Sequence, residues 1–332
     1  MGRVEEYRAE LRRLPEWEAY LKKNSGLPGA RANLELVEAV GEEADPERLW
    51  RLSASSDEFL ALCGTAGLGH LAVSDPVPVM SWLRELAADP RWRVREGVAI
   101  ALQHLGRHSM PRLLAEMDKW STDGPYLQRA AAAGLCEPSL LKEPEHVTRV
   151  LGLLDRMTRS LAASSTRRGE EFRVLRQALG YCWSVAAAAL PEAGRPLMEK
   201  WLRSPDKDVA WVMTSNLSKA RIGALGPGWV TKWRARATAQ ARVTARPAAD
   251  IAATKPYGVA PAAKPASSAP AKKPAARKPV AKKREVKRIA LKRPTRKAAA
   301  KAVRRAALST CFISPSLNLI LEGMVAASST SG

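Results

Sequence analysis

A short helical pattern recurs along the first 240 residues of this chain. Segments such as "DPRWRVREGVAIAL" at 89 and "SPDKDVAWVMTSNL" at 204 open near an Asp and continue with apolar residues at helical spacing. Asp57, Asp89 and Asp123 mark three such starts, 32 and 34 residues apart, and Asp206 marks a later one. A recurring period of this length restricts the chain to stacked units of similar structure.

Each Asp-started segment alternates with a second helical segment. The clearest of these are "VPVMSWLRELAA", "MPRLLAEMDKW", "EHVTRVLGLLDRMTRSL" and "RPLMEKWLR". Asp-Pro, Ser-Pro and Gly-Pro dipeptides separate the segments, and strand-like alternation is absent. The sequence therefore predicts an all-α domain over residues 1–240, with four to five helix pairs. The small-residue runs "RAAAAG" at 129 and "SVAAAAL" at 184 are expected where neighbouring pairs pack closely.

The copy at residue 89 shows the predicted unit most clearly. Asp89 is expected to cap the helix, with Pro90 at its first position and Gly106 at its end. Because Gly106 separates His104 from His108, we do not expect these two side chains to form a metal site. One apolar stripe is expected to face the core, and it contains Val94, Val98, Ala101, Leu102 and Leu105.

These helix pairs resemble HEAT repeats over about residues 30–225. The Asp-started helix, with a hydrophobic residue at its fifth or sixth place and an Arg just after it, is similar to the second helix of a HEAT unit. The resemblance implies a right-handed HEAT-like (armadillo-like) α-solenoid in which the Asp-started helices line the concave face. We therefore expect a non-enzymatic binding protein that holds a protein or nucleic-acid partner on that face.

A more distant similarity is to bacterial DNA alkylation-repair glycosylases built from HEAT-like repeats. Those enzymes use an aromatic cleft with a catalytic carboxylate, often with adjacent tryptophans, and no "WW" occurs here. Asp206 and Asp208 lie close to Trp211 in the sequence and would permit such a site. Glycosylase activity is the alternative to a binding protein, and a protein-interaction scaffold is another; we assign no catalytic residue.

Three arginines near the starts of the expected inner helices are candidates for the concave face: Arg95, Arg129 and Arg176. They form either a basic stripe for a partner or salt bridges between neighbouring repeats. The ten tryptophans are expected mainly to fill the seams between helices. Trp92 and Trp211 carry a sharper alternative, in which a nucleic-acid base stacks on the indole ring.

The chain shows no motif for a cofactor or a metal. Gly-rich phosphate loops and nucleophile elbows are absent, and the four cysteines form no CxxC pair. No segment has the length and apolarity of a spanning helix, so no membrane partner is expected. We expect a reducing, cytoplasmic location with association to the nucleoid. The Ala- and Arg-rich composition is typical of bacteria with GC-rich DNA.

The positive charge is concentrated at the C-terminal end. Residues 1–240 contain 34 Lys/Arg and 30 Asp/Glu, whereas residues 241–332 contain 20 Lys/Arg and 3 Asp/Glu. Residues 241–307, rich in Lys, Arg, Ala and Pro, are predicted to be disordered because they contain few large apolar residues. Their composition resembles that of the tails of linker histones. Residues 308–332 form a short apolar segment to which we assign no role.

We expect the tail to bind nucleic acid, DNA rather than RNA, by neutralising backbone phosphates. A solubilising linker and an anionic lipid surface are the alternatives, although no amphipathic face for membrane insertion is present. The residues predicted to bind phosphates are Lys272, Lys273, Arg277, Lys278, Lys282, Lys283, Arg284, Lys287, Arg288, Lys292, Arg293, Arg296, Lys297, Lys301, Arg304 and Arg305.

Overall fold

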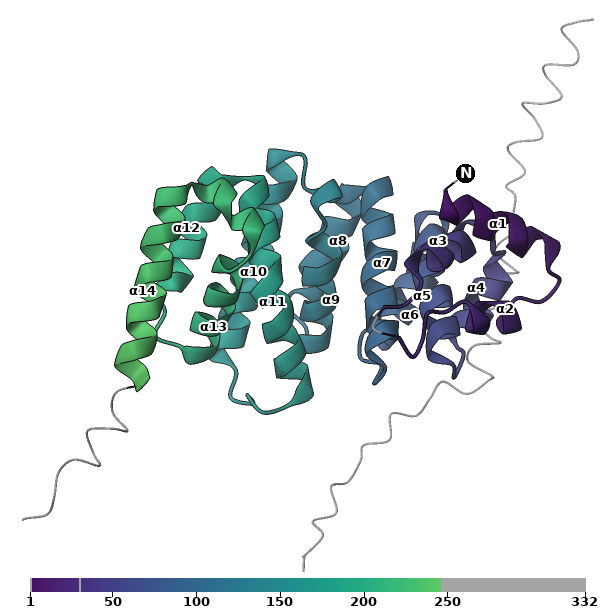
Figure 1. Ribbon diagram of the computed structural model, residues 1–332, viewed down its shortest axis with the longest axis horizontal. Coiled ribbons are helices and arrows are strands. Elements are labelled where there is room, and N and C mark those ends of the chain that lie inside the picture. The colour runs from purple at the N-terminus through teal and green to yellow at the C-terminus, as the bar shows by residue number, and fades with distance from the viewer. Residues whose placement is uncertain (1, 30, 246–332) are drawn as a thin grey trace, which may run out of the picture.

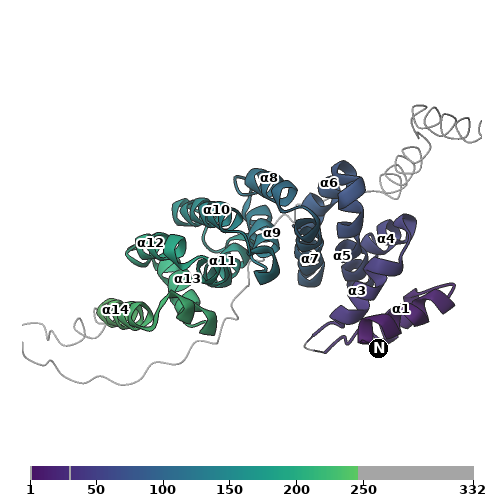
Figure 2. The ribbon, with the colours of Figure 1, turned by 90° about the horizontal axis from the view of Figure 1, so that it is seen from above.

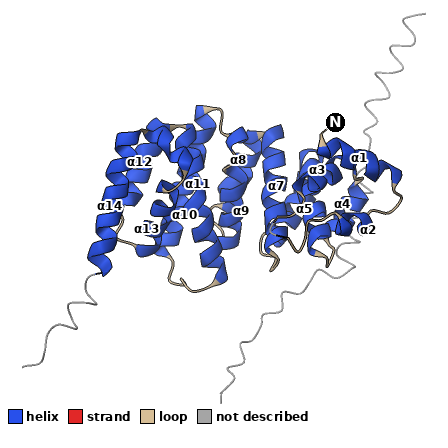
Figure 3. Ribbon diagram, viewed as in Figure 1, coloured by secondary structure: helices blue, strands red, loops and turns tan. Residues whose placement is uncertain are grey.

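The computed structural model describes residues 2–29 and 31–245, which form helices joined by short turns (Figures 1 and 3). These residues contain no strand, which confirms the all-α prediction. The first helices are α1 (Arg3–Arg13), α2 (Glu18–Lys23), α3 (Leu34–Glu43), α4 (Pro46–Ser53), α5 (Glu58–Ser74), α6 (Pro76–Leu86) and α7 (Trp92–His108). They are followed by α8 (Met110–Trp120), α9 (Pro125–Leu135), η1 (Pro138–Leu140), α10 (Pro144–Ala163), α11 (Glu170–Ala189), α12 (Pro191–Leu202), α13 (Lys207–Leu217), η2 (Ala220–Leu225) and α14 (Pro227–Ala245).

The helices alternate between two rows that curve together (Figure 2). The inner row contains α3, α5, α7, α9, α11 and α13, and consecutive members of this row pack against one another. The outer row contains α4, α6, α8, α10 and α12, which pack behind their neighbours in the inner row. Figure 2 shows α1 and α14 at the two ends of the arc, so one side of the inner row forms the inside of the curve.

Aspartate side chains begin several of these helices, as the sequence indicates. The carboxylate of Asp57 accepts hydrogen bonds from two backbone amides in the first turn of α5, both at 3.0 Å. The carboxylate of Asp206 does the same for α13, at 2.9 and 3.0 Å. Such caps satisfy amides that have no partner inside the helix, so these positions fix where the inner-row helices start.

The predicted start of α7 is wrong. This helix begins at Trp92, two residues after Pro90, and Asp89 does not cap it. Instead, the Asp89 carboxylate accepts bonds from the amide of Arg91 at 2.8 Å and from its guanidinium at 2.8 and 2.9 Å. The guanidinium competes for the carboxylate that a cap would need, and a tight turn forms ahead of the helix.

The predicted end of α7 is also wrong, because the helix continues through Gly106 to His108. Gly106 is buried, and a Cβ atom there would lie 2.7 Å from a methyl group of Leu113 and 2.9 Å from one of Leu140. Its small size serves the packing of α7 against α8 and η1 rather than a helix stop. The apolar stripe is confirmed, since all five predicted side chains are buried.

Small residues set the distance between inner-row helices. A Cβ atom on Gly69 of α5 would lie 2.7 Å from the Cα atom of Ala101 in α7. A Cβ atom on Gly97 of α7 would lie 3.0 Å from the Thr65 side chain in α5. The alanine runs of α9 and α11 are buried as expected, including Ala130, Ala131, Ala132, Ala186 and Ala187.

Arginines of the outer-row helices tie consecutive helix pairs together. Arg84 of α6 pairs with Asp123 at 2.7 Å, and Arg156 of α10 pairs with Asp118 of α8 at 2.9 Å. Asp123 therefore precedes α9 without capping it, because its carboxylate faces the previous unit. Arg112 of α8 donates to the backbone carbonyl of Val73 at 3.0 Å. These partners are 38 to 39 residues apart in sequence, about one helix pair.

Candidate functional site

The three candidate arginines lie near the starts of neighbouring inner-row helices, and each contacts an adjacent element. Arg95 of α7 is 5% exposed; it donates to the carbonyl of Asp89 at 2.7 Å and to Glu170 of α11 at 3.2 Å. Arg129 of α9 donates to the carbonyl of Arg95 at 2.6 Å. Arg176 of α11 pairs with Asp208 of α13 at 3.1 Å.

These contacts favour the packing role over a free basic stripe. Burial, followed by the nearby positive charge of Arg95, lowers the pKa of Arg129. Arg176 lies 4.0 Å from the centre of the Trp211 ring, so part of its charge faces an aromatic surface. These guanidinium groups therefore already connect α7, α9, α11 and α13 to one another within the protein.

The tryptophans separate into two groups, and most of them fill seams between helices as predicted. Trp50, Trp120, Trp183 and Trp201 are buried. Two of their indole nitrogens donate to partners on other helices: that of Trp183 to Thr158 at 3.0 Å and that of Trp201 to Asp155 at 2.9 Å.

The exposed group consists of the two tryptophans that the sequence singled out. Trp92 is 49% exposed and Trp211 is 39% exposed. Trp92 begins α7. Trp211 lies on α13, and its ring packs against Gly180 of α11, where a Cβ atom would lie 2.9 Å from it. They lie on different inner-row helices and are not brought into one site.

A carboxylate does lie beside Trp211, but two arginines occupy it. Asp208 accepts from Arg167 at 3.0 Å and pairs with Arg176 at 3.1 Å. Hydrogen bonds to Asp206 and Asp208 raise the pKa of Arg167. One carboxylate oxygen of Asp208 thus contacts Arg167 and the other contacts Arg176, which makes Asp208 part of a structural ion-pair cluster.

The sequence did not indicate the exposed aromatic Tyr181, which is 42% exposed on α11. The guanidinium carbon of Arg221 in η2 lies 4.6 Å from the centre of its ring. Each exposed ring of the inner row is thus accompanied by an arginine: Trp92 by Arg93, Tyr181 by Arg221, and Trp211 by Arg176. Tyr181 lies between Gly180 and Cys182, which are both buried. Helical periodicity alone therefore does not indicate that its ring is exposed.

His104 stacks on His70 of α5, with ring centres 3.6 Å apart. Burial and the positive charges around it lower the pKa of His104 to about 4. No cluster of three or more His, Cys, Asp or Glu side chains suited to a metal ion occurs in residues 2–29 and 31–245. The three cysteines in this part of the chain, Cys63, Cys136 and Cys182, are buried.

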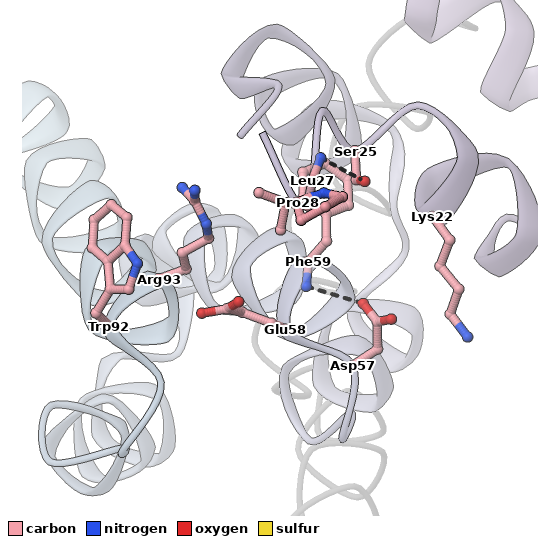
Figure 4. A pocket seen from close by; sticks show the side chains of 9 residues that line it. All are labelled: Lys22, Ser25, Leu27, Pro28, Asp57, Glu58, Phe59, Trp92 and Arg93. Atoms are coloured by element: carbon pink, nitrogen blue, oxygen red, sulfur yellow. Dashed lines mark hydrogen bonds between the residues drawn. The ribbon is translucent and has the colours of Figure 1, made fainter. Parts of the chain in front are cut away.

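A pocket of about 560 Å³ lies where α2, α5 and α7 approach one another. Figure 4 shows Trp92 and Arg93 on one side, facing the loop of Leu27 and Pro28 and the side chain of Glu58. Lys22, Ser25, Asp57 and Phe59 complete the lining. No sequence pattern indicates this pocket, because its walls come from segments about 30 residues apart along the chain.

The pocket also explains why Arg93 departs from the expected pattern. Arg93 lies off the apolar stripe of α7, yet only 8% of its side chain is exposed. It is covered by the chain around Gly29, whose carbonyl lies 3.4 Å from the guanidinium. A helix face that appears polar in the sequence is therefore enclosed by the loop before α3.

The predicted phosphate-binding residues between Lys272 and Arg305, and the segment 308–332, lie outside the described residues. Within the described ranges, no helix has both the length and the apolar character needed to cross a membrane. Searches for similarity found no matching protein-family model, no matching curated protein and no matching solved structure.

Proposed function

We propose that this protein is a non-enzymatic nucleic-acid-binding protein in which right-handed HEAT-like repeats carry a cationic C-terminal tail. The observation that carries the proposal is the charge distribution. Between residues 264 and 305 there are 17 Lys/Arg and a single acidic residue, Glu285. Such a segment attracts a polyanion, and each phosphate that it neutralises releases a condensed counterion. Binding of this kind depends on salt and tolerates any base sequence.

The helical part supports a second role, as the platform that holds a partner. Its two alternating rows of helices fit a HEAT-like α-solenoid, and the inner row lies on the inside of the curve. Trp92 and Tyr181 are exposed rings on inner-row helices, each with an arginine beside it. Arginines and aromatic rings stack on nucleic-acid bases, and they are also frequent at the centres of protein interfaces.

The test compares the full chain with a full-length variant in which the 16 predicted phosphate-binding Lys and Arg residues are replaced by Gln. Binding to a labelled DNA duplex is measured by fluorescence anisotropy across a salt series. For about 6–10 phosphate contacts, the natural chain should lose about 10³- to 10⁵-fold in affinity between about 50 and 200 mM salt. The Gln variant should bind weakly throughout and show a shallow salt dependence.

A matched control replaces only the lysines of the same segment by arginine. This variant keeps the charge and the length, so it should retain the affinity. Equal binding by the Gln variant and the natural chain would show that the tail is not the attachment site.

The contacts of Asp208 support the non-enzymatic assignment over a glycosylase. Both oxygens of its carboxylate already have an arginine partner, one in Arg167 and the other in Arg176. Release of methylated purines from alkylated DNA by the full chain, lost in Asp208→Asn, would overturn this assignment. If the chain binds no nucleic acid at any salt concentration, the scaffold function with a solubilising tail replaces the proposal.

A further inference from the structure

The pocket beside Trp92 contains a buried cation with no close anionic partner. Only 8% of the Arg93 side chain is exposed, and Arg93 is one of the residues that line the pocket. Among the described residues, the one carboxylate within 4.0 Å is that of Glu96, at 3.9 Å, and the carbonyl of Gly29 lies 3.4 Å away. Buried charges are normally paired at shorter distances than these. The wall is therefore suited to a ligand that brings an anionic group.

The mouth of the same pocket offers a flat apolar surface. Trp92 is half exposed, and the guanidinium carbon of Arg93 lies 4.6 Å from the centre of its ring. Leu27 and Pro28 lie on the opposite side of the opening (Figure 4). A planar group at this opening would stack on the part of the indole ring that Arg93 leaves exposed, close to the arginine charge.

The floor of the pocket supplies hydrogen-bond acceptors. Asp57 uses one carboxylate oxygen to cap α5, accepting two backbone amides at 3.0 Å. Glu58 extends from the same helix start toward α7 (Figure 4), and it forms no ion pair within 4.0 Å in the described part of the chain. A purely acidic ligand would be repelled by these carboxylates. A ligand that carries an anionic group and separate N–H donors could pair with Arg93 on the wall and with the carboxylates on the floor.

From these three features we propose that the pocket binds one unstacked nucleotide of a single-stranded nucleic acid. The base stacks on Trp92, the phosphate pairs with Arg93, and Glu58 accepts a hydrogen bond from a base N–H group. The volume of about 560 Å³ falls within the range of about 300–1,000 Å³ that is usual for small-ligand sites. This inference rests on the proposed nucleic-acid binding and adds a preference for unpaired bases, which the tail alone would not provide.

The experiment uses the full chain and a short labelled oligonucleotide, presented either as a single strand or as its duplex. Binding is measured at about 50 mM salt and again above about 200 mM, where the contribution of phosphate contacts falls steeply. We expect the single strand to keep measurable affinity at the higher salt concentration while the duplex does not. Trp92→Ala should lower the single-strand affinity about tenfold, as expected for the loss of one base-stacking contact.

Trp211→Ala is the matched control. Trp211 is also an exposed tryptophan with an arginine against its ring, but it is not among the residues that line the pocket. Its replacement should change single-strand affinity less than twofold. Thermal unfolding of both variants checks that neither has lost its fold. Glu58→Gln keeps the shape of the pocket and should change the preference among homopolymeric single strands.

A second readout locates the base directly. A single strand that carries 5-bromouracil is irradiated in complex with the full chain, and the cross-linked peptide is identified by mass spectrometry. A cross-link at Trp92 supports the proposal. Cross-links confined to residues 246–332, with equal affinities for the natural chain and Trp92→Ala, overturn the pocket assignment and leave the proposed function intact. Failure to bind either nucleic acid at low salt overturns both.

Discussion

The contact between α5 and α7 and the contact between α11 and α13 join equivalent helices by different means. In the first, Gly69 and Gly97 lack the side chains that would keep the two backbones apart. In the second, the buried amide of Asn216 donates to the carbonyls of Leu179 and Val212, both at 2.8 Å, and accepts from the amide of Ser184 at 2.7 Å. A repeated architecture thus determines which helices meet, but it does not determine the chemistry that joins them.

The largest effect is expected where steric fit controls the contact. Gly69→Ala would place a methyl group 2.7 Å from the Cα and carbonyl oxygen atoms of Ala101, and a backbone cannot yield as a flexible side chain does. The free energy of unfolding should fall by about 3 kcal/mol in denaturant titrations. Gly152→Ala is the control, because a Cβ atom on this α10 residue meets nothing within 4 Å. This control should gain up to about 1 kcal/mol from helix propensity; similar losses in both variants would contradict the steric explanation.

A smaller loss is expected where polar bonds control the contact. Asn216→Ala removes three hydrogen bonds in a buried position of α13 and should lower the free energy of unfolding by about 2 kcal/mol. Thr214→Ala, at an exposed position of the same helix, should change it by less than about 0.5 kcal/mol. If the two variants unfold at the same denaturant concentration, the Asn216 bonds do not hold this contact together.

Acid should distinguish the two contacts, because only the α5–α7 contact contains histidines. Burial, then the positive charges of His70, Arg107 and His108, lowers the pKa of His104 to about 4, while Glu42 opposes the shift. In the unfolded chain this pKa is about 6.5, so the unfolded state binds more protons between these values. Stability should therefore fall as the pH drops from about 6.5 to 4.

We expect the acid effect to be about 1 kcal/mol, since the partly exposed imidazole is partly screened by water. His104→Gln should remove most of this pH dependence from unfolding curves measured at fixed salt. His146→Gln, on α10, should leave it in place. Hydrogen exchange should quicken first in α5 and α7; uniform exchange along the inner row would contradict the assignment.

Local patterns predicted much of the fold, because each helix start and apolar face is encoded within a few residues. The segment "MPRLLAEMDKW" coincides with α8, and Asp57 and Asp206 cap as expected. Asp89 failed as a cap because a neighbouring arginine competes for its carboxylate. Such competition depends on side-chain geometry that spacing does not encode.

The candidate site was less predictable, because it depends on contacts between distant segments. The burial of Arg93 requires the loop near Gly29, more than 60 residues earlier in the chain. The sequence selected Trp92 and Trp211 for their positions, but it could not show that these rings are exposed while most other tryptophans are enclosed. The phosphate-binding prediction, by contrast, needs only composition, and it stays a prediction.

The division of the tryptophans has a practical consequence for spectroscopy. All ten lie in the described part of the chain, and Trp92 and Trp211 are the most exposed of them. A water-soluble quencher such as iodide should therefore quench the fluorescence of these two rings first. The fluorescence of the more enclosed tryptophans should be quenched less. With Trp211 replaced, the fast-quenched fraction would come mainly from Trp92, so occupancy of the neighbouring pocket could be followed without a label on either molecule.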